Sequence, residues 1–169
     1  SPLLFINFHT ALLVRDFVAN LTQEDVLVKW PNDLIIHGKK VCGILIERRK
    51  FNNEYYLIIG IGINILQTEF GPLNKAGSLL SQTSKVFDLK SFTEDFHQFF
   101  TSGITKDDST ILERYNQHLF NRGKVALFQH HQERQNGIIK KVDDEGFLWI
   151  ELEKDGLSKF FHKEIEMLY

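Results

Sequence analysis

The sequence has little cysteine and no long apolar run. Cys42 is the single cysteine among 169 residues, so no internal disulfide can form, and the seven histidines show no zinc-ligand spacing around it. No segment reaches the roughly 20 consecutive apolar residues that a membrane-spanning helix needs. The first residues also lack the basic and apolar regions of a secretory signal. These absences predict a soluble protein, and the cytoplasm is its expected compartment.

An excess of charge of one sign is missing as well. The 20 lysines and arginines and the 22 acidic residues give a formal net charge of -2. This balance creates no field that would attract nucleic acid or an anionic membrane, so neither is expected as a partner. The 43% hydrophobic content is enough for one sizeable core, or for a main core with a small satellite domain.

Hydrophobic periodicity predicts helices and a sheet in the first 121 residues. The expected fold class is α/β (α+β), with a mixed β-sheet packed against helices. The almost continuous apolar run over 57–65 indicates a strand that is buried on both faces. Turn residues are expected at 31–33 and 37–40. The expected helices cover residues 2–21, 89–101 and 109–121, the expected strands cover 26–30, 41–47 and 55–65, and a loop with one short helical piece covers 70–84.

The pattern changes after Asn121 to short strands that are separated by turn signals such as Asp143-Asp144-Glu145-Gly146. Such a segment is too short to be robust alone and is expected to dock on the first part. We therefore predict two domains, 1–121 and 122–169, the second a small β-barrel. Its expected strands cover residues 125–128, 137–142, 147–152 and 159–162.

Three blocks of polar residues and glycines lie at the ends of the expected strands. They are Lys29-Trp30-Pro31-Asn32-Asp33, then Lys39 to Glu47, then Gly60-Ile61-Gly62-Ile63-Asn64. Asp33 follows one strand and Lys40 precedes the next, so a hairpin-like connection would bring a carboxylate and an ammonium to the same rim of the sheet. Asn64 could reach that rim if its strand pairs alongside.

Such a rim suits an anionic substrate. Lys40 can neutralise charge on a carboxylate or phosphate oxygen, and Asp33 can orient a metal or the lysine. Asn64 can hydrogen-bond a base. Gly43 and Gly60 would let a ligand lie against bare backbone. Each residue alone also has a simpler structural explanation, because lysines beside turns are usually solvated and strand glycines are usually bulges.

Taken together and in this order, the three blocks closely resemble the signature of biotin protein ligases. That signature consists of Lys-Trp-Pro-Asn-Asp, Lys-x-x-Gly-Ile-Leu and Gly-x-Gly-x-Asn segments. Beyond these blocks, residues 137–148 look like the small SH3-like domain of the family. The resemblance therefore implies the biotin/lipoate ligase fold. It identifies the chain as the C-terminal portion of a catalytic domain (1–121) followed by an SH3-like domain (122–169).

The resemblance also implies an activity and a set of site residues. Biotin and MgATP would give biotinyl-5'-AMP, and a lysine of a biotin carboxyl carrier protein would then attack it. By matching positions, Lys40 and Asp33 would be catalytic, and Asp33 would also lie near the Mg²⁺. The expected substrate-binding residues are Lys40, Gly43, Leu45, Gly60 and Asn64. A homodimer is a further assembly that the resemblance allows.

One part of the family pattern is missing from the 169 residues. The Gly-Arg-Gly-Arg-x-Gly-Arg loop, which lies upstream in the family and grips biotin and phosphates, does not occur, and Arg48-Arg49 lacks the glycines to replace it. We therefore expect an incomplete ligase that is inactive without this loop. Two alternatives stay open: a non-catalytic binding or scaffold module with the ligase fold, and a lipoate or octanoyl transferase relative.

Overall fold

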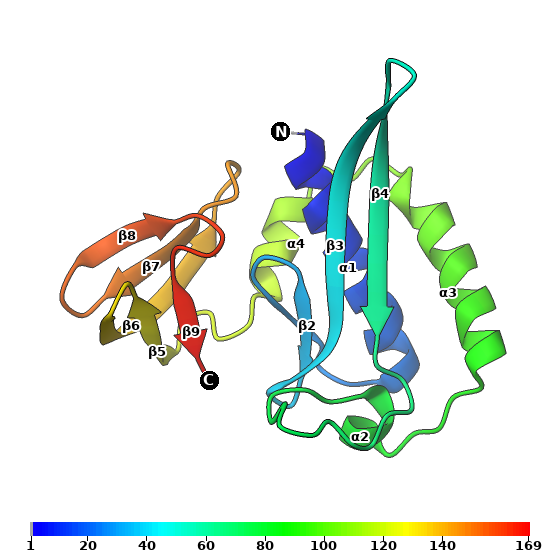
Figure 1. Ribbon diagram of the computed structural model, residues 1–169, viewed down its shortest axis with the longest axis horizontal. Coiled ribbons are helices and arrows are strands. Elements are labelled where there is room, and N and C mark those ends of the chain that lie inside the picture. Colours follow the sequence, from blue (N-terminus) through cyan, green and yellow to red (C-terminus); the bar gives the residue numbers. More distant parts are fainter. Residues whose placement is uncertain (1) are drawn as a thin grey trace.

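The computed structural model describes residues 2–169 and arranges them as two antiparallel sheets with four helices (Figure 1). The first sheet and all the helices come from the first 121 residues, and the second sheet comes from the remainder. In chain order the elements are α1 (Pro2–Thr22), β1 (Leu27–Lys29), β2 (Asp33–Ile36), β3 (Lys39–Phe51), β4 (Glu54–Ile63), α2 (Leu79–Thr83), α3 (Leu89–Ile104), α4 (Ile111–Gln117), β5 (Val125–His130), β6 (Glu133–Val142), β7 (Leu148–Leu152), β8 (Gly156–Phe160) and β9 (Glu166–Leu168).

The N-terminal sheet has the order β1-β2-β3-β4, and each strand is antiparallel to its neighbour. The expected mixed sheet was therefore wrong in its strand directions. Short turns join consecutive strands here, and a short turn can only connect antiparallel strands. The sequence analysis also missed β2, because this strand has four residues and lies between two turns.

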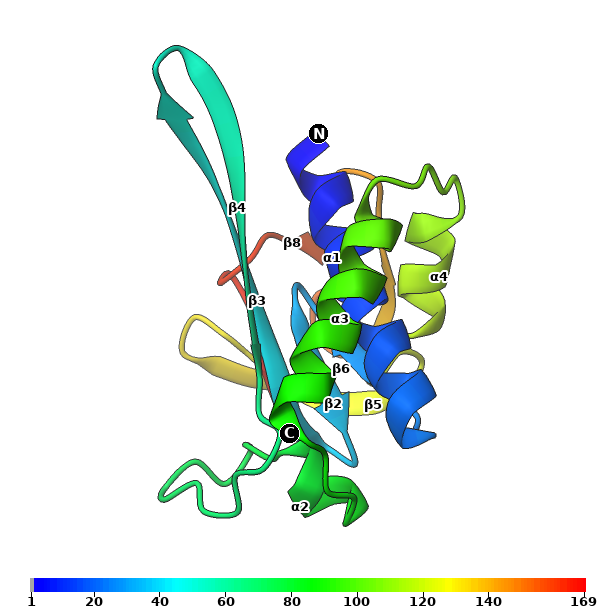
Figure 2. The ribbon, with the colours of Figure 1, turned by 90° about the vertical axis from the view of Figure 1, so that its right-hand side faces the viewer.

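Helices cover one face of the N-terminal sheet, as the side view in Figure 2 shows. Residues of α1 such as Leu12 and Val18 are buried in the core together with Leu34 of β2 and Cys42 of β3. On the other side of α1, the Phe17 ring meets three rings of α3 at 5.2–5.5 Å between centroids. The phenylalanines of α3 thus pack helix against helix. These rings are Phe92, Phe96 and Phe99.

The β3–β4 hairpin extends beyond the helices (Figures 1 and 2). Residues Tyr55, Leu57 and Ile58 of β4 are 59%, 43% and 50% exposed. The expectation that this strand is buried on both faces was therefore wrong. In the described part of the chain no helix lies over the outer face of the hairpin, so only the isoleucines that point to the helical side are partly buried.

The C-terminal sheet has the order β8-β7-β6-β5-β9 and is antiparallel throughout. Its four expected strands are present, whereas β9, only three residues long, was missed. Strands β8 and β9 form the two edges, and no pairing between them closes the sheet within residues 2–169. The small barrel is thus not confirmed. The core of this sheet includes Phe128, Ile139 and Ile150.

Specific hydrogen bonds join the two sheets. The Trp30 indole N–H donates to the carbonyl of Gly146 (3.2 Å). The Asn116 amide, at the end of α4, donates to the carbonyl of Val142 (2.8 Å) and accepts from its N–H (2.7 Å). The turn between β1 and β2 is thereby held against the C-terminal sheet. None of the helices described is long and apolar enough to cross a membrane.

Candidate functional site

Asp33 and Lys40 form an ion pair on the N-terminal sheet. The Lys40 Nζ lies 2.9 Å from Asp33 Oδ1, and the side chains are 45% and 22% exposed. The pair was expected from a hairpin-like connection, and the two residues lie on the two strands of the β2–β3 hairpin. Asp33 begins β2 and faces Gly43 of β3, while a register shift next to Leu34 brings Lys40 opposite Ile35. The expected proximity is therefore present, with both residues inside the strands of the hairpin rather than beside them.

The segment before Asp33 is anchored on several sides. The Pro31 carbonyl accepts hydrogen bonds from the Tyr115 hydroxyl (2.6 Å) and the Asn7 amide (3.2 Å). The Asn32 amide donates to the carbonyl of Ile44 in β3 (2.6 Å), whose N–H donates back to Asn32 (3.2 Å). Together with the Trp30 bond to the second sheet, these contacts fix the backbone that carries Asp33.

A row of residues crosses the sheet on the face that the helices leave open. Lys29 pairs with Asp33, Asp33 pairs with Gly43, and Gly43 pairs with Gly62. Paired residues in an antiparallel sheet point to the same side. The row therefore presents an ammonium, a carboxylate and then two positions without side chains. A ligand could lie flat on the glycines with a charged end beside Asp33 and Lys40.

Two glycines of this face, Gly60 and Gly62, have room for a larger side chain. A Cβ at Gly62 would come no closer than 3.9 Å to another atom, and one at Gly60 no closer than 3.7 Å. Neither residue has a positive φ. Glycine in a strand costs stability because it gives up packing and backbone order. The space above these two glycines thus has no occupant in the chain.

Leu45, Gly60 and Asn64 lie on the same open face. Leu45 pairs with Gly60 one row farther from the ion pair, and its side chain is 62% exposed. Asn64 follows Gly62 by two residues, and its amide donates to the carbonyl of Gly77 (3.0 Å). All the residues expected at the site therefore share one face. Asn64, however, holds a loop rather than pointing freely into the open space.

That loop, residues 64–78 between β4 and α2, is tied to the backbone of Lys40. The Lys40 N–H donates to the carbonyl of Lys75 (2.8 Å), and the Gly77 N–H donates to the carbonyl of Lys40 (2.9 Å). The Lys39 ammonium also donates to the carbonyl of Asn74. The 64–78 loop therefore forms an isolated parallel β-bridge with Lys40 through Ala76 and holds the backbone of Lys40.

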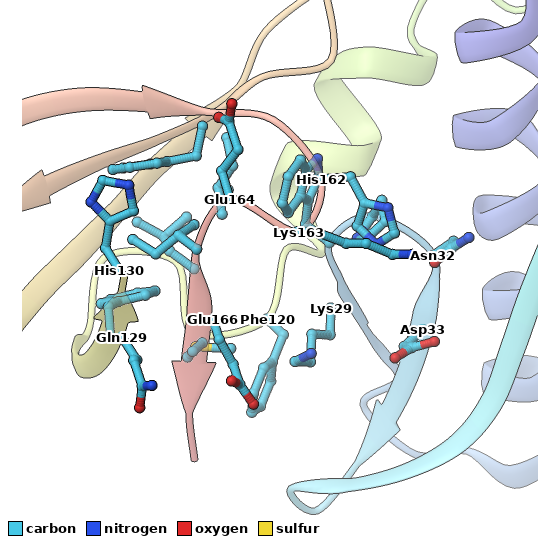
Figure 3. Close-up of a pocket in the computed structure, with 18 of the residues that line it drawn as sticks. Lys29, Asn32, Asp33, Phe120, Gln129, His130, His162, Lys163, Glu164 and Glu166 are labelled. Carbon is cyan, nitrogen blue, oxygen red and sulfur yellow. The ribbon is translucent and has the colours of Figure 1, made fainter. Parts of the chain in front are cut away.

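A groove of about 960 Å³ opens between the ion pair and the C-terminal sheet. Figure 3 shows Lys29, Asn32 and Asp33 on one side of it and residues of β5 and β9 on the other. The charges that face it are mixed, because its lining contains basic groups such as Lys163 and acidic ones such as Glu166. A polar chain of either sign could therefore follow the groove toward Lys40.

The C-terminal sheet contributes groups that the sequence analysis did not assign to the site. His162 lies with its ring edge-on to Trp30, 6.0 Å between centroids. Burial lowers the pKa of His162, and Lys163 lowers it further, while Asp33 opposes them. Burial also raises the pKa of the Tyr169 hydroxyl, and the Asp33 carboxylate adds to this rise. No local pattern in the sequence marks either residue as part of the site.

The charged groups suit a magnesium ion that arrives with a nucleotide. Among residues 2–169 no cluster of three or more histidine, cysteine or acidic side chains could hold a metal. Magnesium is commonly bound by one or two carboxylates together with substrate phosphates and water. Asp33 can supply one such carboxylate oxygen, since only its Oδ1 is paired with Lys40.

Comparisons with known proteins find similar sequences and a similar fold. Residues 2–64, which contain all three motif blocks, match the biotin/lipoate A/B protein ligase family. The bifunctional ligase/repressor BirA of Bacillus spizizenii is 30% identical over 153 residues, which cover 83% of this chain and 46% of that protein. Biotin–protein ligase 2 of Arabidopsis thaliana is 23% identical over 163 residues, covering 85% and 49%. The sequence of this chain is thus similar to those of biotin protein ligases.

Solved structures of biotin protein ligases share the fold. The apo biotin protein ligase of Aquifex aeolicus superposes with a TM-score of 0.78 at 23% identity, over 98% of this chain and 75% of that one. The same protein in complex with biotin and ATP gives a TM-score of 0.76, over 98% and 72%. The shared fold thus extends through both sheets. The chain spans about half the length of the curated biotin protein ligases named above.

Proposed function

We propose that this chain forms part of an enzyme that attaches biotin to a lysine of a biotin carboxyl carrier protein, with ATP as the second substrate. The observation that carries the proposal is the Lys40–Asp33 ion pair beside a glycine-lined face, formed by the residues that match the family signature. In the first step a biotin carboxylate oxygen attacks the α-phosphorus of ATP, and pyrophosphate leaves. In the second step the carrier amine attacks the acyl carbon of biotinyl-5'-AMP, and AMP leaves.

Lys40 supplies a positive charge where both steps develop negative charge. Its ammonium lies beside the open face and can donate to a carboxylate or phosphate oxygen. The ion pair with Asp33 (2.9 Å) holds the ammonium in place before the substrate arrives. A preorganised charge of this kind lowers the barrier because it needs no reorientation during the reaction. Mg²⁺, which would shield the phosphates, is held in this proposal by Asp33 and the nucleotide.

The substrate would lie along the glycine row. Gly60 and Gly62 leave the sheet backbone uncovered, Gly43 lies beside the Lys40–Asp33 pair, and Leu45 offers an exposed apolar side chain next to them. A flat bicyclic ligand such as the ring system of biotin could contact both. Asn64 would act at the nucleotide end, where it already fixes the 64–78 loop. We further assign residues 1–121 to the catalytic domain and 122–169 to an SH3-like domain, in a cytoplasmic protein that forms a homodimer.

A binding titration tests the proposal. Biotin and biotinyl-5'-AMP would be titrated by calorimetry into the 169-residue chain and into the longest polypeptide that contains it. The carrier reaction would be followed with radiolabelled biotin. We expect Lys40→Met to weaken the binding of the adenylate by about 10- to 100-fold, since a charged hydrogen bond is lost.

Lys50→Met is the matched control. It makes the same chemical change in the same strand, at the exposed end of the hairpin. It should bind the adenylate as the unaltered chain does. Absence of binding in both polypeptides would contradict a ligase and favour the scaffold alternative. Transfer of lipoate or octanoate in place of biotin would favour the second alternative, to which the family description also extends.

A further inference from the structure

Tyr169 lies between the two segments that flank the Lys40–Asp33 pair. Its ring makes cation–π contacts with the ammonium of Lys29, 5.4 Å from the ring centroid, and with that of Lys75, 4.9 Å from it. An ammonium within about 6 Å of an aromatic ring is attracted by the electrons of the ring. Tyr169 therefore contacts two cations that come from segments far apart in the sequence.

The backbones of both lysines adjoin the proposed catalytic pair. Lys29 is the register partner of Asp33. The carbonyl of Lys75 accepts the N–H of Lys40 at 2.8 Å. The ring thus touches one neighbour of each residue in the ion pair.

The Tyr169 ring also contacts a buried aromatic residue. Phe120, which follows α4 and is buried, meets it edge-on with 5.4 Å between ring centroids. Tyr169 directly follows β9, whose pairing with β5 ties it to the C-terminal sheet. The position of Tyr169 is therefore determined by the C-terminal sheet and by Phe120, while its ring contacts the two lysines.

We infer that Tyr169 is a positioning residue, whose ring holds the 64–78 loop against the sheet and thereby keeps Lys40 in place for its substrate. Its role in catalysis rests on the proposed ligase function, whereas its role in holding the loop does not. The aromatic ring carries the effect, because both contacts are made to the centre of the ring. The hydroxyl is not needed.

Hydrogen–deuterium exchange measures the loop directly. The amides of Lys40 and Gly77 bridge the loop and the sheet, so they exchange when the loop detaches. We expect Tyr169→Leu to accelerate these two amides by about 10-fold, because two cation–aromatic contacts are lost. Tyr169→Phe should behave as the unaltered chain does. Lys75→Met, which removes one of the two contacts, should give an intermediate rate.

A matched control and two outcomes decide the inference. Tyr55→Leu makes the same substitution at the hairpin end, where the ring contacts Arg48 (3.7 Å), and should leave the amides of Lys40 and Gly77 unchanged. Equal exchange in Tyr169→Leu and in the unaltered chain would overturn the inference. So would an acceleration spread over the whole N-terminal sheet, since that would show a general loss of stability.

The same variants separate this inference from the proposed function. Exchange is measured without biotin or ATP, so a chain that binds neither can still show the loop effect. In a polypeptide with ligase activity, we expect Tyr169→Leu to raise the KM for the substrates by about 10-fold and to change kcat less, with full rescue in Tyr169→Phe. An unchanged KM together with an altered loop would limit Tyr169 to a structural role and overturn the catalytic part.

Discussion

The two faces of the N-terminal sheet are built from the same strands, yet they carry different kinds of residue. The face toward α1 carries Val28, Leu34 and Cys42, each at most 1% exposed. One residue along each strand, the open face carries Lys29, Asp33 and Gly43. On the first face, packing against the helix determines the size and polarity of every side chain. On the second face, packing within the described part of the chain leaves Leu45, Gly60 and Gly62 exposed.

This difference distinguishes residues that pack in the core from residues whose surface is open to a ligand. Strand residues alternate between the two faces, so their local sequence and backbone geometry are nearly the same. What distinguishes them is the energy lost when they change. A substitution on the helical face should destabilise the fold, whereas a substitution on the open face should alter binding and leave stability almost unchanged.

Leu34→Ala should have the largest effect on stability. The Leu34 side chain is fully buried between the sheet and the helices, so its removal leaves a cavity. Such substitutions cost about 2–5 kcal/mol in the free energy of unfolding. Urea denaturation followed by circular dichroism measures the change. Leu45→Ala, on the open face of the next strand, should cost less than about 0.5 kcal/mol, and an equal loss in the two variants would break the comparison.

Cys42 should make the helical face sensitive to high pH. Burial raises the pKa of its thiol from 9.0 to about 12. Above pH 9 the thiol ionises in the unfolded chain but stays protonated in the folded one. The free energy of unfolding should therefore fall by up to about 1.4 kcal/mol per pH unit between pH 9 and 12 from this group.

The measurement is a series of urea denaturation curves between pH 8 and 11, compared between the unaltered chain and Cys42→Ala. Other groups contribute to the pH dependence as well, so the slope in Cys42→Ala supplies the background. We expect the slope to be shallower in the variant. Identical slopes would mean that the thiol is not buried in the folded chain.

The sequence predicted those features that depend on neighbouring residues. The periodicity of α1 and α3, the strands of the C-terminal sheet and the three motif blocks are all local patterns, and each is present in the structure. The proximity of Asp33 and Lys40 was also predicted, because they lie seven positions apart and the residues between them favour a turn.

Features that depend on distant partners were not predicted. The apolar run of β4 indicates burial, but burial on both faces depends on elements elsewhere in the chain, and none of the described helices lies over its outer face. The contact of Tyr169 with Lys29 joins residues 140 positions apart and has no local signal. Strands β2 and β9 are too short for periodicity to reveal.

Gly62→Ala should have the smallest effect on stability and the clearest effect on binding. A Cβ at this position would meet only the carbonyl oxygen of Gly43, at 3.9 Å, which is an ordinary contact. The substitution should therefore leave stability unchanged or raise it by up to about 1 kcal/mol, since alanine loses less backbone freedom on folding. The added methyl group would, however, occupy the space over the sheet that the proposed substrate needs.

Gly137→Ala in the C-terminal sheet is the contrasting variant. There a Cβ would lie 2.9 Å from side-chain atoms of Ile150 and Leu152, so overpacking should destabilise the fold by about 1–3 kcal/mol. We expect calorimetry to show that Gly62→Ala binds biotinyl-5'-AMP at least about 10-fold more weakly, while its urea midpoint stays the same or rises. If Gly62→Ala bound the adenylate normally, the open face would not be the binding surface, and the glycines there would need another explanation.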